Sequence, residues 1–400
     1  MAYQRQDVLT ALHHLGIQKG DTLFIHSQLF SLGLPLNVEN KEDFCHLFFE
    51  ALKEVVGQEG TLIVPTFTYS YCKKEIFDPL TTPSTVGLFS NFVFHQKEVE
   101  RSHNGIYSIA VWGRNKKLYT QDNKNVFGSS GLYSKLFVQD RAFLLSIGLG
   151  LYGSFTFIHA IEREVQSSYR YLKIFHGQLK LKGCFKKDLA FHFVRYLDSS
   201  LKDIKVDHFE NLCLEKGILK KENLGKNFIQ ASSFNELSQE SRIQLETHPY
   251  YFCPEKPVVK NPINNTCPIC TSHDCAVISE NLKMALSYCA CCDLSFISRG
   301  DHPYRPKITF NSSQVDTYLL FSHRLGFELF EEFRLHQILE MKGLLPCSPY
   351  NGSSLKIPTS KYNLYYSKKA VQSLAAINNL DIINLRLRKR FWHFQFRVKG

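Results

Sequence analysis

The residues best suited to chemistry lie in the segment SFTFIHAIE, residues 154–162. Thr156, His159 and Glu162 are three positions apart, so they share one face of a helix that we expect to begin near Thr156. A histidine oriented by a carboxylate is a suitable general base near neutral pH. The threonine could cap the helix or donate a hydrogen bond to a reacting group. The alternative for such a pair is a surface contact of small energetic value.

A buried strand over 143–147 and a glycine-rich turn precede this helix. Gly148, Gly150 and Gly153 match the spacing of the dinucleotide-binding fingerprint. That fingerprint also needs an acidic residue about 20 positions later, at the end of a second strand, and the chain has none there. The favoured interpretation is a tight turn that brings the helix close to the sheet.

Strands and helices alternate along the first part of the chain, which predicts a layered α/β fold with its site at the strand ends. The expected helices cover 8–15, 44–56 and 88–95, and the expected strands cover 22–25, 61–65 and 107–113. Further on, 174–187 alternates like a strand and 190–197 is expected to form a helix.

Two further clusters contain side chains that could bind a ligand. His26 and Ser27 follow a strand, where Ser27 can cap the next helix and free amides bind anions or carbonyl oxygens. Arg101, Ser102 and His103 precede another strand. They form either a turn that satisfies its own backbone or an anion clamp.

The order of the motifs resembles the aminoglycoside 3-N-acetyltransferase family, coenzyme-A-dependent enzymes distinct from the GNAT superfamily. The resemblance covers roughly residues 1–250. Its motifs are LFIHS at 23–27, GTLIVPTF at 60–67, FDP at 77–79 with TPS at 82–84, RSH at 101–103 with Ser108, and TxxHxxE at 156–162.

The resemblance implies a layered α/β/α acetyltransferase domain, acetyl-coenzyme A as donor and an amine of an amino sugar as acceptor. His159 would be the catalytic base, Glu162 the carboxylate behind it and Thr156 the upstream threonine. The residues expected to contact coenzyme A, through its pantetheine arm or its phosphates, are His26, Ser27, Gln28, Ser84, Arg101 and Ser108.

The chemistry asked of these residues is consistent. An amino-sugar nitrogen is mostly protonated at neutral pH, so a base must remove a proton before it attacks a thioester. A carboxylate behind His159 is expected to raise its basicity. Thr156, Ser27 or a nearby amide could meet the charge that develops on the thioester oxygen. No cysteine accompanies the histidine in the motif, which favours direct transfer in a ternary complex.

Acceptor identity stays open at the sequence level. The chain has Gln28 where the family often has a second serine, and Asn104-Gly105 where many members have His-Pro. The 3-amine of an aminoglycoside is the first choice from the family. The net charge of +11 does not indicate an acidic pocket, although Asp78, Glu162 and Glu164 could supply one. A nucleotide-linked amino sugar of surface-glycan biosynthesis fits a basic protein better.

A second region follows a Pro- and Asn-rich linker at 253–265. Cys267 and Cys270, then Cys289 and Cys292, form two Cys-x₂-Cys pairs eighteen residues apart, a spacing typical of a closed four-thiolate zinc site. Unrelated free thiols are the alternative, and Cys275 and Cys291 are spare.

The residues after the second pair resemble the zinc ribbon of sugar C-methyltransferases. We therefore divide the chain into an acetyltransferase-like domain (1–252), the linker, a zinc ribbon (266–300) and a short α+β remnant of a methyltransferase with a basic tail (301–400). The tail, 386–399, mixes basic and aromatic residues. A terminal strand is favoured there over contact with nucleic acid or an anionic membrane.

The composition is that of a soluble globular protein. Twelve cysteines without a secretory signal favour a reducing, cytoplasmic location. The uncharged stretch 142–161 contains glycines, hydroxyls and a histidine, so a strand, loop and helix start is preferred to a membrane span. A homodimer stays open. From another functional class, an inactive fold could act as a zinc-ribbon interaction module.

Overall fold

The computed structural model describes most of the chain up to residue 299 and several later strands. The described residues are 2–121, 124–201, 203–260, 262–263, 266–267, 272–273, 275–280, 285–289, 291, 294–299, 316–321, 364–366, 380–388 and 391–398. They fall into two compact units, Met1–Arg170 with Phe175–Val258, and Tyr171–Ile174 with Val259–Gly400. The boundary between the two units after Val258 lies inside the expected linker. The zinc ribbon and the methyltransferase remnant stay predictions.

The first unit is built on a seven-stranded sheet in the order β4-β5-β2-β1-β6-β10-β9. The central strand β1 is parallel to both β2 and β6, and the outer pairings are antiparallel. In sheet order the strands are Glu100–Arg101, Ile109–Gly113, Thr61–Pro65, Thr22–Ser27, Ala142–Ile147, Asn227–Ser233 and Leu219–Leu224. The central strands are largely buried, as expected for a sheet covered on both faces. This confirms the predicted α/β fold.

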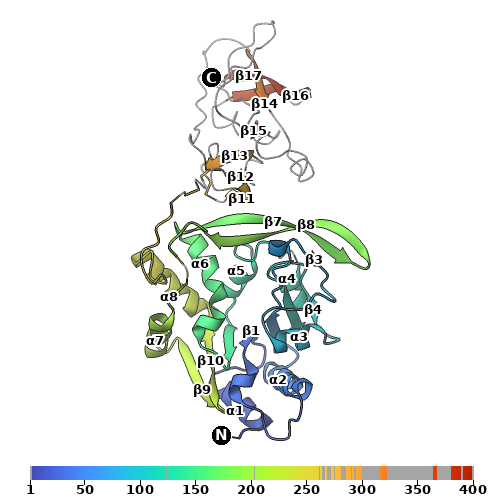
Figure 1. Cartoon of the computed structure of the whole chain (residues 1–400), viewed down its shortest axis with the longest axis vertical. Helices are drawn as coiled ribbons and strands as arrows, with labels where there is room; N and C mark the ends of the chain where they lie inside the picture. The colour runs from blue at the N-terminus through green and yellow to red at the C-terminus, as the bar shows by residue number, and fades with distance from the viewer. Residues whose placement is uncertain are drawn as a thin grey trace. The chain divides into compact units, whose positions relative to one another are not determined.

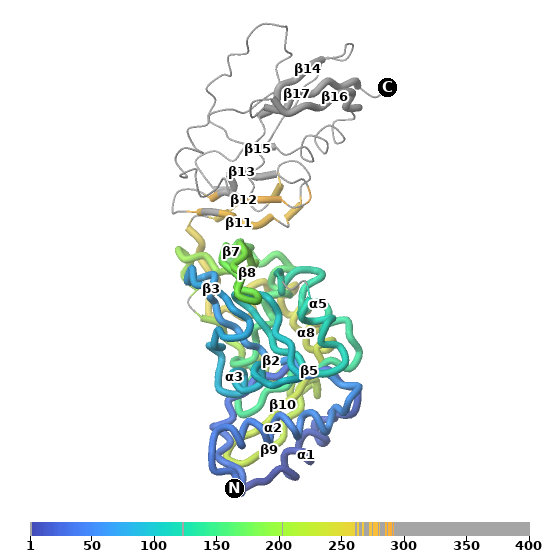
Figure 2. Tube along the Cα trace, turned by 90° about the vertical axis from the view of Figure 1, so that its right-hand side faces the viewer, coloured from blue at the N-terminus to red at the C-terminus, as the bar shows by residue number. Residues whose placement is uncertain are grey.

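Helices cover the sheet and bury its apolar side chains. They are α1 (Arg5–His14), α2 (Lys41–Val56), α3 (Leu88–Phe94), α4 (Lys116–Thr120), α5 (Leu132–Phe137), α6 (Ile158–Glu164), α7 (Asp207–Glu215) and α8 (Phe234–Thr247). In α2, the side chain of Asn40 caps the N-terminus by accepting from the Asp43 amide, and Gly57 ends the helix at φ +64°. Helices α1 and α2 pack side by side at the end of the unit where β9 lies (Figures 1 and 2).

A long hairpin, β7 (Arg170–Leu181) and β8 (Cys184–Arg195), extends from the end of α6 and arches across one end of the unit (Figure 1). Strand β3 (Ile76–Phe77) pairs with β7 in parallel. The helix predicted over 190–197 is wrong, because β8 runs through these residues to Arg195. The segment is rich in aromatic and β-branched residues, which favour strands, and the Phe191 amide donates to the Lys124 carbonyl.

The second unit contains two groups of antiparallel strands. One joins β11 (Cys275–Glu280), β12 (Ala285–Cys289), β13 (Leu294–Arg299) and β15 (Leu364–Tyr366). The other joins β14 (Asp316–Phe321), β17 (Phe391–Val398) and β16 (Leu380–Arg388). The basic tail is therefore largely strand, as expected. Most of the predicted remnant, together with Cys270 and Cys292, lies outside the described residues. Nowhere in the described part of the chain is a helix long and apolar enough to cross a bilayer.

Candidate active site

The site is organised around a contact between His159 and Glu162. A 3₁₀ segment, η3 (Leu151–Phe157), precedes α6, so Thr156 lies in η3 and the α-helix begins two residues later than expected. Nδ1 of His159 lies 2.6 Å from Oε2 of Glu162. The Glu162 side chain is fully buried and that of His159 is 17% exposed. The predicted pair therefore exists, and its histidine is the partner that faces outward.

Two residues that the sequence analysis missed hold Glu162 from behind. Tyr169 donates its hydroxyl to Oε1 of Glu162 at 2.9 Å. Nε of Arg170, at the start of β7, lies 2.8 Å from Oε2, which makes a buried ion pair. Both follow the turn after α6, so three side chains from one short stretch of chain, those of His159, Tyr169 and Arg170, converge on a single carboxylate.

This arrangement lowers the pKa of His159 below its ordinary value. Burial is the main cause and the positive charge of Arg170 adds to it, while Glu162 opposes both. Glu162 taken alone raises the basicity of His159, as expected, but burial and the charge of Arg170 together outweigh this effect. Burial by itself would raise the pKa of Glu162, yet Arg170, His159 and Tyr169 together hold it below its ordinary value. At neutral pH the site therefore pairs a neutral imidazole with a charged carboxylate.

A carboxylate from elsewhere in the protein contacts the glycine-rich turn before η3. Oε2 of Glu210, on α7, accepts from the Leu151 amide at 2.7 Å. A Cβ on Gly150 would lie 3.0 Å from the same oxygen, and Gly148 adopts φ +74°. In a dinucleotide-binding protein a phosphate would accept from such amides. Here a protein carboxylate takes that role, which agrees with interpreting the glycines as a structural turn.

A cavity of about 510 Å³ opens in front of His159. Thr156, His159 and Arg170 line it, together with side chains from η3, β8 and the segment after β8. The other lining residues are Tyr152, Phe155, His192, Val194, Arg195, Leu197, Leu201, Asp203 and Ile204. Its volume suits a small organic ligand. None of the six residues predicted to contact coenzyme A is among the described residues that line this cavity.

His192 is a second histidine in the cavity, and the sequence analysis missed it because it assigned this segment to a helix. Its Nδ1 lies 3.0 Å from the hydroxyl of Tyr107. The Tyr107 ring packs against Phe127, which also packs against His159, at centroid distances of 5.0 and 5.6 Å. The two histidines are therefore supported by one aromatic cluster.

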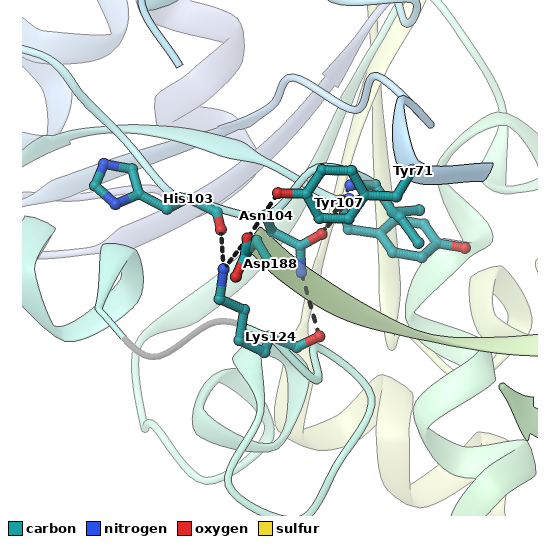
Figure 3. A network of polar contacts seen from close by, with 7 residues as sticks. Tyr71, His103, Asn104, Tyr107, Lys124 and Asp188 are labelled. Carbon is teal, nitrogen blue, oxygen red and sulfur yellow. Dashed lines mark hydrogen bonds and ion pairs between the residues drawn. The ribbon is translucent and has the colours of Figure 1, made fainter. Parts of the chain in front are cut away.

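A polar network fixes the strand that carries His192 (Figure 3). Asp188 of β8 forms an ion pair with Lys124 and accepts from the Tyr71 hydroxyl at 2.6 Å. Lys124 also donates to the His103 carbonyl at 2.8 Å, while the His103 ring points away from the network (Figure 3). Asp188 and His192 lie four residues apart on one face of β8. Anchoring Asp188 thus helps to set the position of His192.

The Asn104-Gly105 departure from the family pattern belongs to the same network. Oδ1 of Asn104 accepts from the amides of Ile106 and Tyr107 at 2.9 and 2.8 Å. A Cβ on Gly105 would lie 2.2 Å from Cε1 of the Tyr71 ring. Glycine is therefore required beside Tyr71, and Asn104 orders the backbone at Tyr107.

The residues predicted for the pantetheine arm lie at the end of β1. His26 and Ser27 are half-buried, and Gln28 is exposed. Burial lowers the pKa of His26 to about 4, so this ring is neutral. Its Nε2 is buried and has no hydrogen-bond partner among the described residues. The placement leaves their role as a prediction.

The other three residues predicted to contact coenzyme A, Arg101 and Ser84 at its phosphates and Ser108, are engaged within the protein. Arg101 is 6% exposed and donates to the carbonyls of Pro79, Thr82 and Thr66 and to the Thr66 hydroxyl. Burial lowers its pKa to about 10. Ser108 is buried beside it and donates to the Thr66 carbonyl at 2.6 Å. The Ser84 hydroxyl accepts from the Val86 amide at 3.2 Å. These contacts support a structural role, and the contact of these residues with coenzyme A stays a prediction.

Two of the four predicted zinc ligands can be described, and both are buried cysteines. Cys267 and Cys289 are accompanied by a third buried cysteine, Cys275, which is one of the two considered spare and whose thiol donates to the Ser272 carbonyl at 3.4 Å. Cys275 pairs with Cys289 across β11 and β12. No group of three or more His, Cys, Asp or Glu suited to hold a metal ion occurs in the described ranges, which exclude Cys270 and Cys292.

Comparison with known proteins adds a family and a fold. A family model described as aminoglycoside 3-N-acetyltransferase matches residues 24–246, more than half of the chain. The SPbeta prophage-derived aminoglycoside N(3')-acetyltransferase-like protein YokD of Bacillus subtilis (strain 168) is 25% identical over 185 residues, 40% of this chain and 65% of that protein. The chain thus matches less than two thirds of that relative's length.

Solved structures show the same fold. The chain aligns with the crystal structure of the aminoglycoside acetyltransferase AAC(3)-Xa at a TM-score of 0.53 and 18% identity, covering 62% of this chain and 94% of that one. It aligns with AAC-IIIb in a binary complex with CoASH at a TM-score of 0.53 and 18% identity, covering 64% and 100%. At these identities the similarity concerns the fold.

Proposed function

The chain belongs to the aminoglycoside 3-N-acetyltransferase family, and on that basis we propose that it transfers the acetyl group of acetyl-coenzyme A to an amino group of an amino sugar. The observation that carries this proposal is the placement of His159, which lines a ligand-sized cavity while its Nδ1 contacts a buried carboxylate. An Nδ1–H that donates to Glu162 leaves Nε2 as the nitrogen able to accept a proton.

His159 is the proposed general base. The acceptor, an ammonium at neutral pH, first releases one proton to solvent. The neutral amine then attacks the thioester carbonyl carbon, a C–N bond forms, and the nitrogen gives a second proton to Nε2. Collapse of the tetrahedral intermediate breaks the C–S bond, and the coenzyme A thiolate takes up a proton from the imidazolium. The charged Glu162 stabilises that imidazolium while it exists. The lowered pKa of His159 keeps the base in its neutral form between turnovers.

Thr156 is the proposed donor to the thioester oxygen. It lies one turn before His159 and lines the same cavity. Removing one such donor typically costs about 3–4 kcal/mol of transition-state stabilisation. His26, Ser27 and Gln28 remain the proposed contacts of the pantetheine arm. The binary complex of AAC-IIIb with CoASH, a protein of the same fold, supports coenzyme A as the carrier.

The family supports an aminoglycoside amine as the acceptor, and the solved structures of similar fold include AAC-VIa bound to sisomicin. A nucleotide-linked amino sugar is the second candidate, favoured by the net charge of +11. An inactive fold that serves as an interaction module is the third, and the intact contact between His159 and Glu162 weighs against it.

For the second unit we propose one structural zinc ion bound by Cys267, Cys270, Cys289 and Cys292. The support is their spacing together with the burial of the two cysteines that the structure describes. Four thiolates would close the coordination sphere and stabilise the strands around them. No catalytic step involves this ion.

The direct test measures thiol release from acetyl-coenzyme A with kanamycin-type compounds and with nucleotide amino sugars. We expect His159→Ala to abolish transfer while coenzyme A still binds. His13→Ala, at an exposed position of α1, is the matched control and should retain activity. Near-normal turnover by His159→Ala would refute the catalytic assignment, and no turnover with any amine would favour the interaction module.

A further inference from the structure

The cavity in front of His159 contains few groups that could bind a polycation. Among its described lining residues are two arginines, two histidines and one carboxylate, Asp203. Oδ1 of Asp203 already accepts from the Tyr152 hydroxyl at 2.9 Å and from the Ile204 amide at 2.8 Å. The cavity therefore has one partly occupied carboxylate to offer to ammonium groups.

The other carboxylates considered at the sequence level do not line this cavity. Glu162 is fully buried behind His159, and its oxygens contact His159, Tyr169 and Arg170. Asp78 forms an ion pair with Lys180, and Glu164 forms one with Arg242. An aminoglycoside with several ammonium groups would thus meet mainly donor groups, and like charges brought together at a binding surface cost several kcal/mol.

The same lining suits an anion. Arg195, at the end of β8, is an exposed guanidinium, and one of its nitrogens donates to the Leu201 carbonyl at 3.3 Å. His192 lies three residues earlier, an odd spacing that places it on the other face of a regular strand, and both its ring nitrogens lie near the Tyr107 hydroxyl, at 3.0 and 3.3 Å. The guanidinium of Arg195 presents paired donors that match phosphate oxygens. Both side chains line the cavity that contains His159.

We infer that the acceptor is an amino sugar carrying a phosphate group, which Arg195 binds while the amine faces His159. This inference rests on the proposed acetyltransferase function and specifies its substrate class. The phosphate could belong to a sugar monophosphate or to a nucleoside diphosphate sugar, because both present the same oxygens.

The test compares kcat/KM for matched acceptors in the thiol-release assay with the full chain. The acceptors are glucosamine, glucosamine 1-phosphate, glucosamine 6-phosphate, a uridine diphosphate sugar with a free amine, and kanamycin. A charge-assisted contact to phosphate predicts a preference of about tenfold or more for a phosphorylated amine over glucosamine. The monophosphates and the nucleotide sugar distinguish the two sources of the phosphate.

Variants of Arg195 test whether this side chain causes the preference for phosphorylated acceptors. Arg195→Gln should bring the ratio of phosphorylated to unphosphorylated acceptor towards one, and Arg195→Lys should restore part of it. Lys186→Gln is the control, because it removes the same charge from an exposed position of β8 outside the cavity. Thermal unfolding verifies that each variant folds. An increase in the KM for acetyl-coenzyme A alone would overturn the inference, because Arg195 would then bind the donor.

Failure of the inference can be separated from failure of the proposed function. Acetylation of kanamycin in preference to every phosphorylated amine would overturn the inference and leave the acetyltransferase function intact. If no amine is acetylated, the proposed function fails, and titration calorimetry in the presence of coenzyme A decides the inference alone. Tighter binding of the phosphorylated sugars that is lost in Arg195→Gln would support it, and equal or weaker binding would overturn it.

Discussion

His159 and Arg170 share one oxygen atom, Oε2 of Glu162, which lies 2.6 Å from Nδ1 of the histidine and 2.8 Å from Nε of the arginine. A permanent cation therefore lies close behind the proposed base. It disfavours the protonated imidazole, whereas the carboxylate between them favours it. The balance explains how a buried histidine can stay neutral at neutral pH and still be stabilised when it accepts a proton.

Glu162→Gln tests the carboxylate. The amide can still accept a hydrogen bond, but it cannot stabilise the imidazolium by charge, so kcat should fall by about 10²- to 10⁴-fold. The variant also leaves the buried Arg170 without its counter-charge, which should lower the free energy of unfolding by about 3–5 kcal/mol. Thiol-release kinetics and denaturant unfolding measure the two effects.

The matched control is Glu164→Gln on the same helix. Glu164 is half-exposed and pairs with Arg242, a type of contact worth about 0–1 kcal/mol. Equal losses of activity in the two variants would show that α6 tolerates no charge change, and would remove the specific role of Glu162.

The pH dependence of kcat tests Arg170. Since the pKa of His159 is lowered, the acid limb of the profile should lie below the ordinary histidine value of about 6.5. Removing a cation makes protonation of its neighbour easier, so Arg170→Gln should raise the pKa of His159 and move the limb to higher pH. Arg163→Gln, which removes one positive charge from α6, is the control. Superimposable profiles for wild type and Arg170→Gln would contradict this account.

Arg101→Met distinguishes a structural arginine from a phosphate ligand. The variant leaves several buried carbonyls without their donor, so the free energy of unfolding should fall by about 2–4 kcal/mol. Arg101→Lys should recover only part of this, because a lysine cannot reproduce the planar set of donors. Unchanged stability with a markedly higher KM for acetyl-coenzyme A would instead establish the phosphate role predicted from the sequence.

Glu210→Ala tests the carboxylate that holds the glycine turn. The Leu151 amide would lose its acceptor at 2.7 Å and keep, among the described residues, only the Gln230 side-chain oxygen, which lies 3.0 Å away in the flipped amide orientation. The cost should therefore be at most about 1–3 kcal/mol, that of an unsatisfied buried group. A looser turn should also displace η3, so kcat should fall more than the KM values change. Glu215→Ala, at an exposed position of the same helix, should change neither the free energy of unfolding nor kcat. If Glu210→Ala instead allowed nicotinamide dinucleotides to bind, the turn would be a masked cofactor site.

Sequence reasoning succeeded where a local pattern determines the structure. The spacing of His159 and Glu162 is a property of one helix turn, and their contact followed from it. The parallel strands β1, β2 and β6 are short apolar runs bounded by turn signals. Such runs can be recognised in the sequence without knowing which strands pair with them. Two of the family motifs, at 23–27 and 60–67, contain most of β1 and all of β2, and the motif at 156–162 follows β6, which is why the acetyltransferase fold could be anticipated.

The residues that were missed depend on contacts across the fold. Tyr169 and Arg170 follow the helix after Ser167-Ser168, and only the turn between α6 and β7 brings them back to Glu162. His192 was missed because its strand was assigned to a helix. The aromatic residues around it fit the periodicity of a helix or of a strand, and only the pairing with β7 makes the segment a strand. The burial of Arg101 was equally invisible, since most of its partners are backbone carbonyls.

Metal analysis of the purified full chain tests the second unit. A four-thiolate site predicts about one zinc ion per chain, since each Cys-x₂-Cys pair supplies two ligands. Cys267→Ser and Cys289→Ser should each lower the zinc content and the stability, because a metal that binds only the folded state stabilises it. Cys291→Ser is the control, because Cys291 is exposed and is not one of the four proposed ligands. Zinc-free protein with all cysteines intact would eliminate the ribbon and leave Cys267, Cys275 and Cys289 as buried free thiols.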